Sequence, residues 1–167
     1  MAKKSIKENK SPYQLRREEL GLSREQASEL LGAIPPERIQ RLENGAPHPD
    51  EVLVMADKYR MPDLCNYYCS HECPIGQQYV PEIKVADLSV IVLKMLDSLN
   101  QVAKEKDRLV EIAADGRIDD EEIRDFVSIQ KKLDRISVTV DTLRLWADKM
   151  LAEGAINMEV YNAYITK

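Results

Sequence analysis

Helix start and stop signals recur at short intervals between residues 11 and 62. Serine caps the first amides of a helix, and proline is tolerated in the first helical turn, whereas glycine and Asn-Gly end helices. The start signals are Ser11-Pro12, Ser23 with Gln26, Pro35-Pro36, Pro49 and Pro62. The stop signals are Gly21, Gly32 and Asn44-Gly45. This spacing predicts five helices of about two turns each, packed as a compact all-α domain.

The pattern changes after residue 84, where apolar residues recur at spacings of three and four. The first run is Leu88, Val92, Met95, Leu99, Val102, Leu109 and Ala113. The second run is Phe126, Ile129, Leu133, Ile136, Val140, Leu143, Ala147 and Met150. Such heptads predict two helices of about 28 and 33 residues whose seams face each other in a coiled-coil-like antiparallel hairpin. Gly116 is expected to end the first of these helices, and Asp119 with Glu122 to cap the second.

The N-terminal helices carry a recognisable pattern, "LGLSREQASELLGAIPPERIQRLENGAPHPDEVLVMADKY". This stretch resembles the Cro/phage-repressor (Xre-type) helix-turn-helix family. The matching residues are Leu22-Ser23, Gln26, Leu31-Gly32, Ile39, Leu42-Glu43, Gly45, Pro49, Val52 and Ala56. The resemblance covers residues 12 to about 68 and implies a five-helix domain. In that family the third helix, here about residues 36–44, enters the major groove of DNA.

The resemblance also implies which side chains would touch DNA. These are Arg24 near the start of the second helix, then Glu37, Arg38, Gln40 and Arg41 on the third helix, and Asn44 at its end. Guanidinium pairs with guanine and carboxamide with adenine, so Arg41 and Gln40 suit base recognition. Ile39 and Leu42 are expected to point into the domain. Glu37 and Pro36 are less typical of a DNA-facing surface, because a carboxylate near phosphates is repelled unless it accepts from a cytosine amino group.

Composition and charge narrow the function classes. Residues 1–60 carry 11 Lys and Arg against 10 Asp and Glu, and residues 61–167 carry 13 against 19. DNA affinity would therefore reside in the N-terminal third, without a strong basic field. No secretory signal and no apolar stretch of about 18 residues is present, which favours a cytoplasmic protein without a membrane span. Without a Gly-rich phosphate loop or a serine elbow, an enzyme is not expected.

Several apolar residues lie off the hairpin seams and need a further surface. They are Val90, Ile91, Leu93, Leu96, Val110, Ile112, Leu145, Trp146 and Leu151. They could be covered by a second hairpin, by the N-terminal domain or by the C-terminal "INMEVYNAYI". Helix-turn-helix proteins commonly bind two DNA half-sites with two-fold symmetry, which favours a homodimer through the C-terminal helices.

These features predict a sequence-specific DNA-binding transcriptional regulator acting as a dimer. The alternative is a non-enzymatic protein-interaction adaptor that uses a repurposed helix-turn-helix scaffold and the acidic hairpin. The expected organisation is a helix-turn-helix domain at 1–73, a linker at 74–84, the hairpin at 85–153 and a tail at 154–167.

All three cysteines fall within "LCNYYCSHECPIG", together with one of the two histidines. In a reducing cytosol, a disulfide framework is not expected from three cysteines. Three interpretations stay open: buried core thiols without a cofactor, a zinc site, or an iron–sulfur or thiol-redox switch. The candidate ligands are Cys65, Cys69, His71 and Cys73. On a continuous helix, His71 would face away from the cysteine stripe, so a site with all four ligands requires the helix to break before His71.

Overall fold

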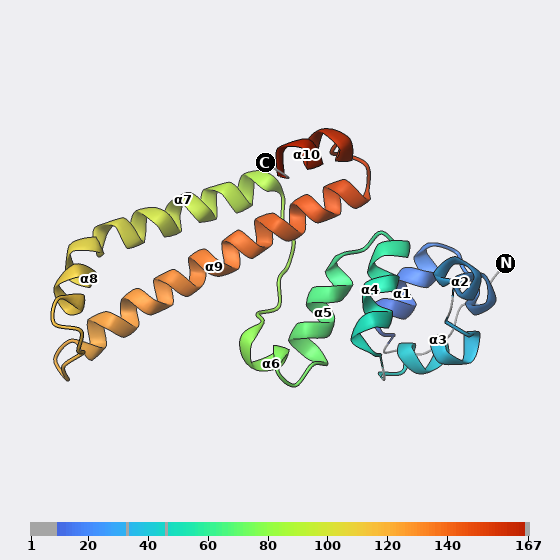
Figure 1. Cartoon of the computed structure of the whole chain (residues 1–167), viewed down its shortest axis with the longest axis horizontal. Helices are drawn as coiled ribbons and strands as arrows, with labels where there is room; N and C mark the ends of the chain where they lie inside the picture. Colours follow the sequence, from blue (N-terminus) through green and yellow to red (C-terminus); the bar gives the residue numbers. More distant parts are fainter. Residues whose placement is uncertain (1–9, 33, 46, 166–167) are drawn as a thin grey trace. The chain divides into compact units, whose positions relative to one another are not determined.

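A computed structural model describes residues 10–32, 34–45 and 47–165, and in this part of the chain all regular secondary structure is helical, as predicted (Figure 1). The first six helices are α1 (Pro12–Glu19), α2 (Arg24–Leu31), α3 (Pro36–Glu43), α4 (Pro49–Lys58), α5 (Asp63–His71) and α6 (Gly76–Tyr79). The next four are α7 (Leu88–Lys104), α8 (Lys106–Ala113), α9 (Ile123–Ala152) and α10 (Met158–Ile165). Two compact units result. The first includes α1–α6, and the second is Ile83–Trp146, which contains α7, α8 and most of α9.

The first five helices begin where the local signals predict. The Gln14 amide donates to the Ser11 side chain at 3.4 Å. Ser23 and Gln26 form a complete capping box, with bonds of 3.2 Å and 2.9 Å. Gly32, which follows α2, has a φ of +78°, a left-handed conformation that favours glycine. Local chemistry therefore sets the helix boundaries around the α2–α3 turn.

A single apolar cluster holds α1–α5 together. Its buried members are Tyr13, Ala27, Leu31, Ile34, Ile39, Leu42, Val52, Met55, Ala56, Tyr59 and Leu64. Ile39 and Leu42 fix α3 on this core, as predicted, and so turn its opposite face outward. The Tyr13 hydroxyl also donates to the Glu72 carboxylate at 3.1 Å, which ties α1 to the end of α5. The outward face of α3 is thus oriented by the burial of Ile39 and Leu42 in this core.

The segment that the sequence predicts to be a linker contains α6, which packs closely on α5. A Cβ added to Gly76 would lie 2.0 Å from the Cys69 carbonyl oxygen, so only glycine fits this approach. Beyond α6, the Asn66 side-chain amide donates to the Pro81 carbonyl at 3.0 Å. The chain therefore stays attached to α5 as far as Pro81.

α7 and α9 run antiparallel, which confirms the predicted hairpin (Figure 1). The prediction of one continuous first helix is wrong, because α7 ends at Lys104 and α8 begins at Lys106. At the break, the Glu105 amide bonds to the Val102 carbonyl, three residues back. The Glu105 carboxylate accepts from Lys132 of α9. The break thus coincides with a cross-link between the two arms of the hairpin.

The face of α7 that packs on α9 agrees with the predicted seam only at Met95 and Val102, which are half-buried. Ile91 is 1% exposed and Ser98 is also buried, whereas Leu88, Val92 and Leu99 of the predicted seam are exposed. On α9, Ile129 of the predicted seam is buried, as expected. α7 has two adjacent apolar stripes, and spacing alone does not decide which of them meets the partner helix.

Candidate nucleic-acid interface

The outward face of α3 carries Glu37, Gln40 and Arg41, all exposed. This arrangement follows from helical geometry, because the neighbouring residues Ile39 and Leu42 are completely buried. The sequence therefore predicts correctly which side of α3 is free. Whether these residues bind DNA stays a prediction.

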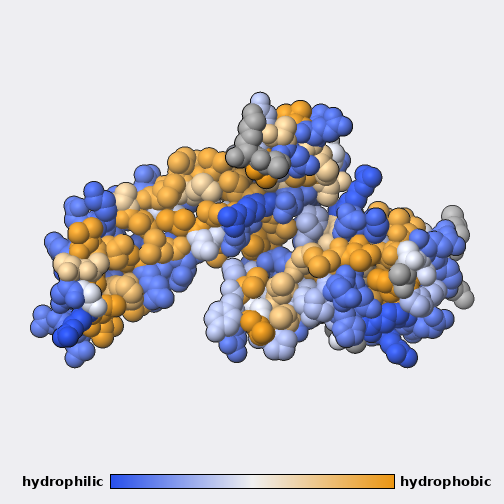
Figure 2. All heavy atoms as spheres, in the orientation of Figure 1, coloured by the Kyte–Doolittle hydropathy of each residue, from blue (hydrophilic) through white to orange (hydrophobic). Residues whose placement is uncertain are grey.

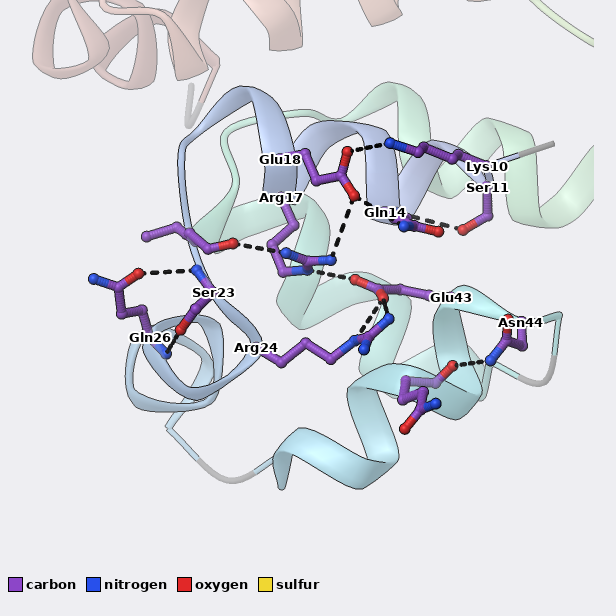
Figure 3. Close-up of polar contacts among 12 residues, drawn as sticks. Lys10, Ser11, Gln14, Arg17, Glu18, Ser23, Arg24, Gln26, Glu43 and Asn44 are labelled. Atoms are coloured by element: carbon purple, nitrogen blue, oxygen red, sulfur yellow. Dashed lines mark hydrogen bonds and ion pairs between the residues drawn. The ribbon is translucent and has the colours of Figure 1, made fainter. Parts of the chain in front are cut away.

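Arg24 is not a free cation at the start of α2 but is held by Glu43, the last residue of α3 (Figure 3). Its Nε lies 2.9 Å from Glu43 Oε2, and its Nη2 lies 2.8 Å from the same oxygen. The other Glu43 oxygen accepts from Arg17 Nε at 2.5 Å. Because the Glu43 side chain is 1% exposed, this carboxylate is a buried bridge between α1, α2 and α3.

Arg38 is also held within the protein, by Glu51 of α4. The pair is bidentate, with Nε–Oε1 at 2.6 Å and Nη2–Oε2 at 2.5 Å. The Glu51 carboxylate also accepts from the His48 amide at 2.9 Å, at the start of α4. The hydrogen bond from Arg38 lowers the pKa of Glu51 below its usual value. Arg38 therefore links α3 to α4 and presents only part of its guanidinium outward.

This pair leads to a pH-dependent expectation. Glu51→Gln should lower the free energy of unfolding by about 1 kcal/mol at pH 7, because the charged pair is lost. A lowered pKa stabilises the fold above the unfolded carboxyl pKa of about 4.3, and this contribution disappears as the pH falls through the folded value. Urea unfolding at pH 7 and pH 3 should show the difference from the parent protein shrinking at the lower pH. Glu37→Gln is the control, and an undiminished effect of Glu51→Gln at pH 3 contradicts the assignment.

Arg41 is the cation on this face whose guanidinium has no hydrogen bond or ion pair within the described part of the chain. Asn44 is exposed just after α3, and its side-chain amide donates to the Gln40 carbonyl at 2.7 Å (Figure 3). The Gln40 carboxamide itself is exposed. Of the six predicted contact residues, four are therefore exposed, while Arg24 and Arg38 are anchored by carboxylates.

A comparison with protein families now identifies this segment. A helix-turn-helix family model matches residues 14–62. This part of the chain belongs to the helix-turn-helix family. The match confirms the resemblance predicted for the N-terminal third, and it spans α1–α4 with the candidate interface. Neither the curated proteins nor the solved structures contain a match to the chain.

The segment around α3 carries more acidic than basic residues. Residues 23–51, from the start of α2 into α4, contain three arginines and six acidic residues. Two of the arginines pair with Glu43 and Glu51, as described above. The remaining acidic residues include the exposed Glu37. Phosphate attraction therefore depends on few side chains.

The cysteine cluster lies on α5 of the helix-turn-helix domain and just beyond it. α5 continues through His71, whose ring stacks on Tyr67 at a centroid distance of 4.5 Å. Cys65, Cys69 and Cys73 are free and half-buried, and burial raises the pKa of the Cys65 thiol. Among the described residues, no group of three or more His, Cys, Asp or Glu is arranged to hold a metal ion. The zinc or iron–sulfur site thus stays a prediction without assembled ligands.

The sequence does not reveal which carboxylates form ion pairs with these arginines. Glu43 belongs to the family pattern, but its two partners lie 26 and 19 residues earlier in the chain. Glu51 is recognisable as a residue of the first turn of α4, but not as the partner of Arg38. Only the packing of α3 against α1, α2 and α4 reveals these pairs.

Within the described residues, no helix has both the length and the apolar character that crossing a bilayer requires.

Proposed function

We propose that the chain is a sequence-specific DNA-binding transcriptional regulator whose helix α3 enters the major groove. The observation that carries this proposal is the family match over residues 14–62, combined with an α3 that buries Ile39 and Leu42 and presents Gln40 and Arg41. A helix-turn-helix domain supports DNA binding in general. The base contacts of individual α3 side chains are part of this proposal.

Each exposed residue of the interface has a chemical role in this proposal. Arg41 donates to the N7 and O6 atoms of guanine, and Gln40 pairs with adenine. Glu37 accepts from a cytosine amino group, which is the base contact available to a carboxylate. Arg24, fixed by Glu43, turns its remaining N–H groups toward a phosphate. Asn44 contacts the backbone at the end of α3.

The regulator acts as a homodimer in this proposal. One α3 makes few contacts, and two copies on adjacent half-sites would bury about twice the surface and read twice the sequence. The C-terminal helices supply the self-association.

A second candidate function is favoured by the acidic charge of the segment around α3. Residues 23–51 contain six acidic residues and three arginines, and the pairs of Arg24 with Glu43 and Arg38 with Glu51 leave four acidic residues against one arginine. A helix-turn-helix scaffold that had lost DNA binding would carry such a surface. In that case the domain is a protein-interaction adaptor and α3 contacts a partner protein.

Selection from random duplexes, followed by mobility-shift assays, tests DNA binding directly. Arg41→Ala is expected to weaken binding to the selected sequence by about 10- to 100-fold and to relax preference at one base pair, because a bidentate pair is lost. Arg144→Ala, an exposed arginine of α9, is the matched control and should leave affinity unchanged. For the parent protein, the logarithm of affinity should fall linearly with the logarithm of salt concentration.

Two results would overturn the regulator in favour of the adaptor. One is the recovery of no enriched sequence by a folded protein at low salt. The other is equal loss of binding in Arg41→Ala and Arg144→Ala, which would place the DNA contact outside α3.

A further inference from the structure

All three cysteines of the chain lie on α5 or just beyond it, and the proposed DNA contacts use none of them. Cys65, Cys69 and Cys73 are free thiols of intermediate exposure, neither sealed in the core nor fully in solvent. Figure 2 shows hydrophobic and polar residues side by side on the surface over α5 and α6. Thiols that solvent reaches are open to reaction with small oxidants.

The spacing of the cysteines limits which two of them can join. Along a helix, Cα atoms eight residues apart are separated by ~12 Å, whereas a disulfide spans about 4.4–6.8 Å, so Cys65 cannot join Cys73. Residues four apart have Cα atoms separated by ~6 Å and Cβ atoms by about 5–6 Å. Because a disulfide needs Cβ atoms about 3.5–4.5 Å apart, either remaining pair must close by about 2 Å.

The pair of Cys69 with Cys73 can make this approach, because Cys73 lies outside α5. Cys65 and Cys69 are both within α5, so their approach would distort the helix. The Cys73 amide has already left the regular helical pattern, since it donates to the Tyr68 carbonyl, five residues back, at 3.0 Å. Only the chain beyond α5 has to move for the Cys73 sulfur to reach Cys69.

In the reduced protein, the Cys73 sulfur helps to hold α6 on α5. The Gly76 amide, at the start of α6, donates to Cys73 Sγ at 3.4 Å. The same glycine lies so close to the Cys69 carbonyl that no side chain would fit, and Figure 1 shows α6 turning back beside α5. The two cysteines therefore contact Gly76 from two directions, Cys73 through its sulfur and Cys69 through its backbone.

We propose that Cys69 and Cys73 are a dithiol that hydrogen peroxide oxidises to a disulfide, and that the disulfide releases α6 from α5. One thiol, reacting as its thiolate, attacks a peroxide oxygen; the O–O bond breaks, giving a sulfenic acid and one water. The second thiol attacks the sulfenic sulfur and displaces another water. In total, two thiols lose two electrons and two protons, and one peroxide becomes two waters.

The release of α6 follows from the movement of one sulfur. Disulfide formation draws the Cys73 sulfur toward Cys69, so the Gly76 amide loses its acceptor. Helix α6 belongs to the connection between α5 and α7. When α6 leaves α5, the connection between the helix-turn-helix domain and the hairpin becomes longer. Oxidation is thereby converted into a change of tether length, which goes beyond the proposed function because it requires no DNA contact.

Thiol counting and disulfide mapping of the full chain test the pair. After treatment with hydrogen peroxide, the parent protein should lose two of its three thiols, form a disulfide between Cys69 and Cys73 within the chain, and recover all thiols with dithiothreitol. Cys65→Ser is the matched control and should form the same disulfide. Cys69→Ser and Cys73→Ser should form no disulfide within the chain.

Hydrogen exchange of the parent protein tests the release of α6 without any variant. The amides of Gly76–Tyr79 should exchange at least about 10-fold faster in the oxidised protein, because α6 loses its attachment, and should return to the reduced rate with dithiothreitol. The amides of α2, which contains no cysteine, are the internal control and should keep their rate.

Three kinds of result would overturn the proposal. One is a peroxide-treated protein that keeps all its thiols, joins Cys65 to Cys69, or forms disulfides only between chains. Another is a disulfide between Cys69 and Cys73 that leaves exchange in α6 unchanged. The third is stoichiometric zinc in the purified protein, measured by elemental analysis, with all three thiols protected from peroxide.

Discussion

Replacing Glu43 with alanine is expected to lower the free energy of unfolding of the helix-turn-helix domain by about 3–5 kcal/mol. Glu43 holds two guanidinium groups, and the Arg17 side chain beside it is only 7% exposed. Without the carboxylate, Arg17 keeps its bond to the Leu22 carbonyl at 2.7 Å, and its buried charge retains only the longer ion pair with Glu18, whose Oε1 lies 3.9 Å from Arg17 Nη2. Urea unfolding followed by circular dichroism measures the change.

Two companion variants sharpen this expectation. Glu29→Ala removes an exposed carboxylate from α2 and should change stability by less than about 0.5 kcal/mol. Arg17→Met combined with Glu43→Leu removes both buried charges and should recover much of the loss, because apolar replacements of a buried pair are often neutral. A loss below about 1 kcal/mol for Glu43→Ala would show that solvent reaches Arg17 and that the bridge is not a buried one.

The helix boundaries of the N-terminal third could be predicted because their causes are local. A capping serine and its partner three residues later are visible in any sequence, and the structure places Ser23 and Gln26 in just that relation. The outward face of α3 could also be predicted, since the period of the helix alternates Ile39 and Leu42 with Gln40 and Arg41.

The pairing of the arginines could not be predicted, because it depends on contacts between residues far apart in the chain. Arginine is a residue type that commonly contacts DNA, yet Arg24 and Arg38 are each oriented by a carboxylate on another helix. The packing face of α7 could not be predicted either, because α7 has two adjacent apolar stripes and either could pack on α9. Only the assembled hairpin shows that Ile91 is inside and Leu99 outside.

The cysteine cluster illustrates how proline acts at a helix end. Pro74 restricts the residue before it, Cys73, and this residue lies beyond α5. His71 therefore remains helical, and its Nδ1 lies 3.2 Å from the Tyr67 carbonyl. From the sequence, the helix could either continue through His71 or unwind before it. The stacking of His71 on Tyr67 could not be predicted, because it depends on side-chain positions.

Substitutions at two neighbouring residues of α3 should affect stability and DNA binding separately. Leu42→Ala is expected to lower the free energy of unfolding by about 2–5 kcal/mol, because Leu42 is completely buried and its loss leaves a cavity under α3. Arg41→Ala removes an exposed side chain without a partner in the described part of the chain and should change stability by less than about 0.5 kcal/mol. Denaturant unfolding of both variants, beside the binding assay, compares the two effects.

The difference in stability between Leu42→Ala and Arg41→Ala depends on the orientation of α3. It therefore also tests the candidate interface. If Arg41→Ala is as destabilising as Leu42→Ala, Arg41 is part of the packing, and a loss of DNA affinity in that variant would report unfolding instead of a lost base contact. If Leu42→Ala leaves stability unchanged, α3 is not seated on the core through this side. With the expected result, the face that carries Gln40 and Arg41 is free of any role in folding, so its side chains are available for recognition.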